Sequence, residues 1–155
     1  MYYGDEVGME GYRDPFNRRT YPWDALTEDQ KELLAFYRSV SVLRKIWPVL
    51  KTGAYRTIFA QDDLWAFERY LDEEGKDFFG QTQQGPRHVL FAFNRHRSEE
   101  KHFAVSDSLR EKWSTSQALC DEQHDRPSYT QCGHCMAMQK RLVLKPLSSA
   151  IIVSS

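Results

Sequence analysis

The residues with the clearest potential for chemistry are three cysteines and a histidine late in the chain. Cys120, His124, Cys132 and Cys135 follow the pattern C-x3-H-x7-C-x2-C, which offers four ligands of the kind that tetrahedral zinc prefers. The segment 132–135 also has the spacing of a redox dithiol, but such a site needs a βαβ context that this sequence lacks. Cysteines in hairpins without a metal are commoner than either site. We therefore predict no metal site, and zinc at these four residues is the alternative.

Composition narrows the classes of partner. The 155-residue chain has 21 basic and 22 acidic side chains and a formal net charge of −1, which argues against nucleic acid and against an anionic membrane surface. No stretch approaches the roughly 18 consecutive apolar residues that a membrane-spanning helix requires. The odd cysteine count of 3 favours a reducing compartment such as the cytoplasm.

One helix is predicted, over residues 25–47. Thr27 and Gln30 stand in the relation of a capping box at its start. Apolar residues then recur at steps of three and four from Leu33 to Trp47, which gives the helix one apolar face. Pro48 is expected to end it.

After residue 53 the apolar period changes from helical to two, which predicts a β-domain. Because no helix separates these strands, we expect an antiparallel sandwich or barrel. Residues 72–86 read as an exposed loop and residues 106–113 as a short helical turn, while residues 114–139 receive no assignment. The strands are predicted at 55–59, 64–71, 87–94, 141–145 and 150–153.

Two blocks near the start of the chain are specific. Residues 2–6 read Tyr-Tyr-Gly-Asp-Glu, and residues 14–18 read Asp-Pro-Phe-Asn-Arg with Trp23 beyond them. Together they resemble the end of the catalytic barrel in the α-amylase family, glycoside hydrolase family thirteen. The likeness is nearest to neopullulanases, cyclomaltodextrinases and amylopullulanases. It continues through the helix and the strands up to Asn94 and then fades.

This resemblance implies a mainly β fold in two parts. Residues 1–47 would be the loop after strand eight and helix eight of a truncated (β/α)8 barrel, and residues 48–155 an antiparallel β-sandwich C-terminal domain. The family's catalytic carboxylates come from earlier strands, so no catalytic residue is expected here. Asp5 and Glu6 cannot replace them, since neighbours on an extended segment point to opposite faces. The chain would be the C-terminal part of an α-glucan-hydrolysing glycosidase, inactive in isolation.

The resemblance also implies a substrate-binding pair. In the family's Asp-Pro-x-x-Arg loop the residues matching Asp14 and Arg18 hold a glucose unit on the non-reducing side of the cleaved bond. An ion pair that only fastens the loop is the alternative. The nearby aromatics Tyr2, Tyr3, Tyr12 and Trp23 are expected to pack rather than to stack on sugar. An α-glucan oligosaccharide is the expected partner through the parent barrel. No cofactor is expected for this chain, although calcium is compatible with a parent enzyme.

A second class of function stays open. The chain is alternatively a free-standing β-sandwich module with a structural or carbohydrate-binding role. Coding DNA upstream of Met1 separates the two, because an in-frame continuation with the family's carboxylate motifs would identify a longer enzyme. In either case the apolar helix face is expected to promote self-association.

Overall fold

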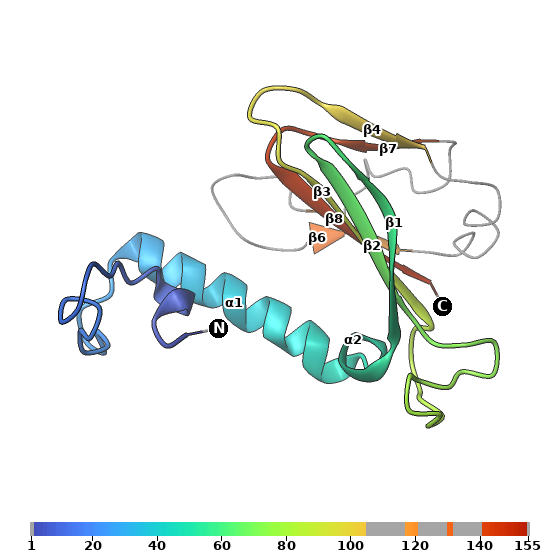
Figure 1. Ribbon diagram of the computed structural model, residues 1–155, viewed down its shortest axis with the longest axis horizontal. Coiled ribbons are helices and arrows are strands. Elements are labelled where there is room, and N and C mark those ends of the chain that lie inside the picture. Colours follow the sequence, from blue (N-terminus) through green and yellow to red (C-terminus); the bar gives the residue numbers. More distant parts are fainter. Residues whose placement is uncertain (1, 105–116, 121–129, 132–140, 155) are drawn as a thin grey trace. The chain divides into compact units, whose positions relative to one another are not determined.

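The computed structural model describes residues 2–104, 117–120, 130–131 and 141–154, and it divides the chain into two compact units (Figure 1). The first unit extends to Val42 and the second begins at Leu43. All the named strands lie in the second unit, and every described strand pairing is antiparallel. The predicted mainly β, antiparallel fold is confirmed.

In its described residues the first unit holds a 3-10 turn, a loop and most of one long helix. The turn η1 spans Asp5–Val7 and the helix α1 spans Glu28–Ile46. The predicted capping box is present: the Thr27 N–H donates to Gln30 Oε1 at 3.1 Å, and the Gln30 N–H donates to Thr27 Oγ1 at 3.3 Å. Because Thr27 is therefore the cap, α1 begins at Glu28 and not at residue 25 as predicted.

The far end of α1 leads directly into a second, short helix. The Trp47 N–H still bonds to the Leu43 carbonyl at 3.0 Å, and Pro48 then caps α2, Val49–Thr52. Gly53 ends α2 in a crowded position: a Cβ there would lie 2.5 Å from the Val49 carbonyl oxygen. A residue with a side chain at this position would therefore have to displace backbone.

The surface of α1 is only partly covered. No residue of α1 is buried. The apolar side chains of α1 are therefore half-buried or exposed among the residues that the structure describes. Val42 and Ile46 are among the exposed large apolar side chains of α1. Neither described helix has a stretch both long and apolar enough to cross a membrane.

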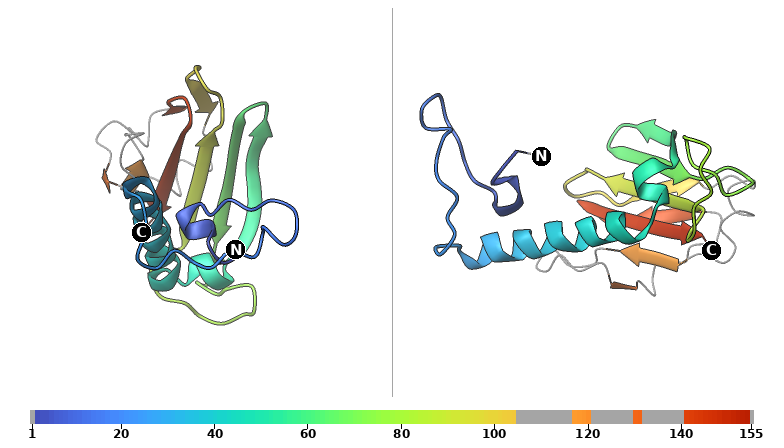
Figure 2. Two further views of the ribbon diagram at one scale, coloured as in Figure 1. Left: turned by 90° about the vertical axis from the view of Figure 1, so that its left-hand side faces the viewer. Right: turned by 90° about the horizontal axis from the view of Figure 1, so that it is seen from below.

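The described residues of the second unit form eight strands besides α2. Six belong to one large sheet with the order β1-β2-β3-β8-β5-β6, and two form a small sheet, β4-β7. The last strand, β8, therefore lies inside the large sheet, between β3 and β5 (Figure 2). A β-bulge between Thr57 and Phe59 interrupts the otherwise regular register of β1 with β2. The strands are β1 Ala54–Gln61, β2 Leu64–Tyr70, β3 His88–Asn94, β4 Lys101–Ala104, β5 Gln117–Cys120, β6 Thr130–Gln131, β7 Arg141–Leu144 and β8 Ser148–Ser154.

The five predicted strands are present, but the prediction missed β4, β5 and β6. These three strands are short, between 2 and 4 residues, and none has an apolar alternation long enough to be recognised. Such short strands are defined by hydrogen bonds to a neighbouring strand, as β5 is by its pairing with the longer strand β8. The helical turn predicted over 106–113 lies outside the described residues.

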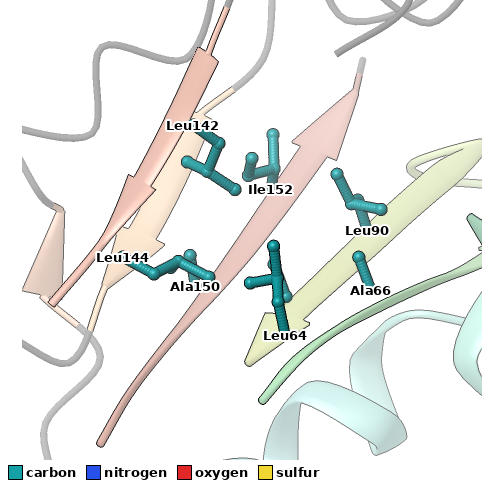
Figure 3. Close-up of a cluster of buried hydrophobic side chains, with 8 residues drawn as sticks. Leu64, Ala66, Leu90, Leu142, Leu144, Ala150 and Ile152 are labelled. Carbon is teal, nitrogen blue, oxygen red and sulfur yellow. The ribbon is translucent and has the colours of Figure 1, made fainter. Parts of the chain in front are cut away.

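The main core lies between the two sheets. Leu142 and Leu144 of β7 project toward Ala150 and Ile152 of the large sheet, as Figure 3 shows. Each of these side chains is at most 4% exposed, and Leu64, Ala66, Leu90 and Ala92 complete the cluster. A second cluster lies on the opposite face of the large sheet. There α2, Leu43 and Trp47 pack with Leu71, Val89 and Ile151.

The loop between β2 and β3 is organised by one carboxylate. Asp77 accepts hydrogen bonds from the N–H groups of Phe79 and Gln81 at 3.0 and 2.9 Å, and from the Gln83 side chain at 2.8 Å. The Thr52 hydroxyl contributes most to holding the pKa of Asp77 below its ordinary value, and these N–H donors act in the same direction. The predicted loop is confirmed, with Phe78 and Phe79 exposed on it.

Candidate functional site

The segment 2–9 does not have the extended conformation assumed from the sequence. Asp5 and Glu6 lie in the 3-10 turn η1, between two glycines with positive φ, Gly4 at 88° and Gly8 at 61°. Each carboxylate bonds to nearby backbone: Asp5 Oδ2 accepts from the Tyr2 N–H at 2.8 Å, and Glu6 Oε2 accepts from the Gly4 N–H at 3.0 Å. The two acidic side chains therefore stabilise their own turn.

Asp14 and Arg18 are brought together by the next loop. A turn places them in contact, with the Phe16 N–H bonded to the Arg13 carbonyl at 2.8 Å and the Arg18 N–H to the Pro15 carbonyl at 3.0 Å. Arg18 Nε then lies 2.6 Å from Asp14 Oδ1. The Asp14–Pro15 peptide bond is cis.

This ion pair is open to solvent. The Arg18 and Asp14 side chains are 72% and 60% exposed, so the pair contributes little to stability. Only one nitrogen of the guanidinium and one oxygen of the carboxylate are used in the described contact. The pair therefore presents further N–H donors beside a carboxylate acceptor, which is the combination that vicinal sugar hydroxyls bind.

A pocket of about 420 Å³ lies on the same unit but is lined by other residues. Its charged and polar walls come from Glu10, Arg19, Thr20 and Gln30, with Met9 as an apolar wall. Neither Glu10 nor Arg19 was predicted as a site residue from the sequence. A signal was available for Arg19, since it directly follows Arg18 within the recognised loop.

The aromatic residues of this loop are exposed, contrary to the expectation that they pack. Tyr2, Tyr12 and Trp23 are 67%, 69% and 79% exposed. Tyr3 is fastened more firmly, because its hydroxyl donates to the Arg19 carbonyl at 2.7 Å. This bond joins the first block of the loop to the segment that follows Arg18.

The cysteine pattern is not tested by the structure. The backbone of Cys120 ends β5, whereas His124, Cys132 and Cys135 lie outside the described residues. Among the residues that are described, no three His, Cys, Asp or Glu side chains come together in a way that would hold a metal ion. No calcium or zinc ligand set is thus assigned here.

A buried charged cluster lies in the second unit. Glu68 of β2 is 0% exposed, and its carboxylate contacts Arg56 Nε at 2.5 Å and His88 Nδ1 at 2.7 Å. The Arg56 guanidinium also lies over the Tyr70 ring, 4.9 Å from its centroid. Register explains the cluster, because Arg56 pairs with Glu68 across β1 and β2.

Comparison with known proteins finds amylopullulanases, cyclomaltodextrinases and neopullulanases among the relatives of this chain. The chain is 39% identical over 101 residues to an amylopullulanase of Thermoanaerobacterium thermosulfurigenes, a match over 65% of this chain and 5% of that protein. It is 39% identical over 77 residues to a cyclomaltodextrinase of a Bacillus species, over 50% of this chain and 13% of that protein. It is 37% identical over 76 residues to neopullulanase 2 of Thermoactinomyces vulgaris, over 48% of this chain and 13% of that protein.

Solved structures agree in fold. An Anoxybacillus α-amylase superposes with a TM-score of 0.66 at 19% identity, covering 99% of this chain and 28% of that chain. A debranching enzyme of Nostoc punctiforme superposes with a TM-score of 0.62 at 24% identity, covering 99% of this chain and 27% of that chain. No family model matches.

The chain is therefore a homologue of α-amylase-family glycosidases, as its resemblance predicts. Within that family its relatives are amylopullulanases, cyclomaltodextrinases and neopullulanases, and they match part of the chain. The chain spans between 5% and 13% of the length of these three relatives.

Proposed function

We propose that this chain is the C-terminal part of an α-glucan-hydrolysing enzyme of the amylopullulanase and neopullulanase type. The observation that carries the proposal is the 39% identity over 101 residues to an amylopullulanase. Chance does not produce identity of that extent. The activity belongs to the longer enzyme in this proposal, because the chain corresponds to 5% of that relative.

In this proposal residues 1–47 are the strand-eight loop and helix eight of a (β/α)8 barrel, and residues 48–155 are the C-terminal β-sandwich domain. The two packed antiparallel sheets of the second unit support the sandwich assignment. The likeness to an α-amylase over 99% of this chain supports a shared fold along the whole sequence. In barrel enzymes the loops that follow the strands build the active-site face, which would place residues 2–24 there.

Asp14 and Arg18 are proposed to bind one glucose unit of an α-glucan. Their contact at 2.6 Å holds donor and acceptor groups side by side at the solvent boundary. A carboxylate accepts from one sugar hydroxyl while the guanidinium donates to its neighbour. Related folds have been solved with such ligands, among them a protein named AmyP with maltose and the Geobacillus thermoleovorans α-amylase with acarbose.

These residues position substrate and do not cleave it. Retaining hydrolysis needs two carboxyl groups facing each other at about 5 Å across the glycosidic bond. The carboxylates of Asp5 and Glu6 are each engaged by a backbone N–H within their own turn. We expect the purified 155-residue chain to release no sugar from starch, pullulan or cyclodextrin. Hydrolysis above a buffer blank would contradict this assignment.

The binding role of Arg18 is tested in a complete enzyme that carries this loop. Loss of a charged hydrogen bond to substrate costs about 1.5–3 kcal/mol, so Arg18→Ala should lower kcat/KM on a long glucan by roughly ten- to a hundred-fold. A short activated glucoside that does not reach Arg18 should be cleaved at almost the wild-type rate. Arg13→Ala, an exposed arginine of the same turn, is the matched control.

Two results separate binding from a fastening role. If Arg18→Ala reduces activity equally on both substrates and lowers the melting temperature, the ion pair only fastens the loop. If Arg13→Ala has the same selective effect on the long glucan, the loss comes from general loop charge. Either result would remove Arg18 from the binding site.

A further inference from the structure

The loop that carries Asp14 and Arg18 is held only weakly by its own contacts. Every residue from 11 to 20 is exposed. The ion pair between Asp14 and Arg18 adds little, because both of its side chains are more than half exposed. The loop's own backbone hydrogen bonds join residues at most three apart, such as Phe16 and Arg13. A contact from outside the loop is therefore needed to keep Arg18 in one place.

Tyr3 supplies such a contact. Its hydroxyl donates to the Arg19 carbonyl oxygen at 2.7 Å, and Arg19 directly follows Arg18 in the chain. Among the described residues this is the one hydrogen bond that joins residues 10–24 to the segment 2–9. It connects residues 16 positions apart, so it closes the loop at the residue next to Arg18.

The turn that carries Tyr3 is itself firmly closed. The Met9 N–H bonds to the Gly4 carbonyl at 2.9 Å, and a Cβ on Gly4 would lie 2.5 Å from the Met9 sulfur. The Met9 side chain therefore packs directly against this turn. The turn also meets α1, since a Cβ on Gly8 would lie 3.3 Å from a methyl carbon of Leu33. Tyr3 thus reaches the loop from a fixed base.

We propose that Tyr3 is a positioning residue for sugar binding by Arg18, an inference that rests on the proposed function of Asp14 and Arg18. The Tyr3 hydroxyl holds the Arg19 carbonyl, and this limits where the neighbouring Arg18 guanidinium can lie. Holding a binding group in place before the ligand arrives lowers the entropic cost of binding. The hydroxyl proton of Tyr3 is used by the Arg19 carbonyl, so Tyr3 acts through Arg18 and does not donate to the sugar.

Limited trypsin digestion of the 155-residue chain tests whether Tyr3 holds the loop. Tyr3→Phe keeps the ring and removes only the hydroxyl. When opening is fast relative to cleavage, proteolysis follows the population of the open form. Cleavage after Arg19 should therefore be about two- to tenfold faster in Tyr3→Phe, the range that one net hydrogen bond represents. Cleavage after Arg97, which is exposed in the second unit, should not change and is the internal reference.

Kinetics in a complete enzyme that carries this loop test the consequence for binding. Tyr3→Phe should raise KM for a long glucan about two- to tenfold and leave kcat within about twofold of wild type. A short activated glucoside that does not reach Arg18 should be cleaved at almost the wild-type rate. Tyr2→Phe is the matched control, because Tyr2 is the neighbouring tyrosine of the same turn and is 67% exposed. It should behave as wild type in both assays.

A double-mutant cycle shows whether Tyr3 acts through Arg18. With alanine at position 18 there is no guanidinium left to misplace. In the Arg18→Ala background, Tyr3→Phe should therefore change kcat/KM on the long glucan by less than about twofold. A direct contact between Tyr3 and the sugar would be lost independently, and the two effects would then multiply.

The outcomes separate this inference from the proposed function. If Arg18→Ala shows its selective loss on the long glucan but Tyr3→Phe behaves as Tyr2→Phe, the inference is wrong and the proposed function stands. Unchanged cleavage after Arg19, or effects that multiply in the double variant, would also overturn it. An equal loss on both substrates with a lowered melting temperature would make the Tyr3 bond structural only. If Arg18→Ala has no selective effect, the proposed function fails and this inference fails with it.

Discussion

In the ion pair between Glu68 and Arg56, replacing the arginine should destabilise the fold much more than replacing the glutamate. Glu68 is 0% exposed, and its ion-pair partner Arg56 retains 40% exposure of its side chain. Arg56→Met removes the strongest donor and leaves a buried negative charge with the His88 contact. Removing one partner of a buried pair costs about 3–5 kcal/mol. Loss of the contact with the Tyr70 ring adds about 0.5–1 kcal/mol, which the thioether of methionine partly replaces.

The reverse change should cost much less. Glu68→Met removes the buried charge itself, and the partly exposed guanidinium of Arg56 then regains water. Apolar replacement of a buried ion is often close to neutral, so we expect a loss of about 1–2 kcal/mol. The double variant Arg56→Met/Glu68→Met should then be more stable than Arg56→Met alone. This corresponds to a coupling of about 2–3 kcal/mol between the two sites.

Urea unfolding at pH 7, followed by circular dichroism of the sheet, measures these differences. Arg95→Met is the control, because Arg95 pairs with Asp63 at 3.1 Å while its side chain is 81% exposed. It should lower the free energy of unfolding by less than about 1 kcal/mol. The reasoning from burial would be refuted if Arg56→Met and Glu68→Met lowered the free energy of unfolding equally and the double variant showed the sum of the two losses.

Three further predictions concern stability. Leu142→Ala should lower the free energy of unfolding by about 2–5 kcal/mol in the same urea titration, because Leu142 is 2% exposed in the main core; a loss below about 1 kcal/mol would place it outside that core. Gly53→Ala should cost about 1–3 kcal/mol in a thermal melt, since its Cβ would meet the Val49 carbonyl oxygen; an unchanged melting temperature would contradict that contact. The lowered pKa of Asp77 stabilises the fold above the ordinary aspartate range near pH 4, and this contribution is lost as pH falls through the lowered value. Asp77→Asn should flatten the fall in stability as the pH drops below about 4, and an unchanged slope would show that another group causes it.

The parts of the fold that were predictable depend on neighbours in sequence. Thr27 and Gln30 are three residues apart, so their capping box follows from spacing alone, and the structure contains it. The short runs of apolar and aromatic residues in β2 and β3 likewise identify them without a partner. The contact of Asp14 with Arg18 across a Pro-initiated turn belongs to the same local class.

The parts that were not predictable depend on distant pairing or on loop conformation. Glu68 meets His88 only because β2 and β3 pair in one register, and nothing near Glu68 in sequence indicates it. Glu10 and Arg19 border one pocket because the intervening loop returns on itself. The 3-10 turn at Asp5 escaped prediction because two glycines with positive φ bend a segment that otherwise reads as extended.

The place of β8 inside the large sheet has a consequence for biosynthesis. A ribosome releases β1, β2 and β3 first, and these can pair as a meander as soon as they emerge. The free edge of β3 then waits until Ser148 and the residues after it are made, since Asn94 pairs with Ser148. During this interval an apolar strand edge stays open to other nascent chains. Slow translation after β3 should therefore reduce the soluble yield, and a chaperone that shields strand edges should restore it.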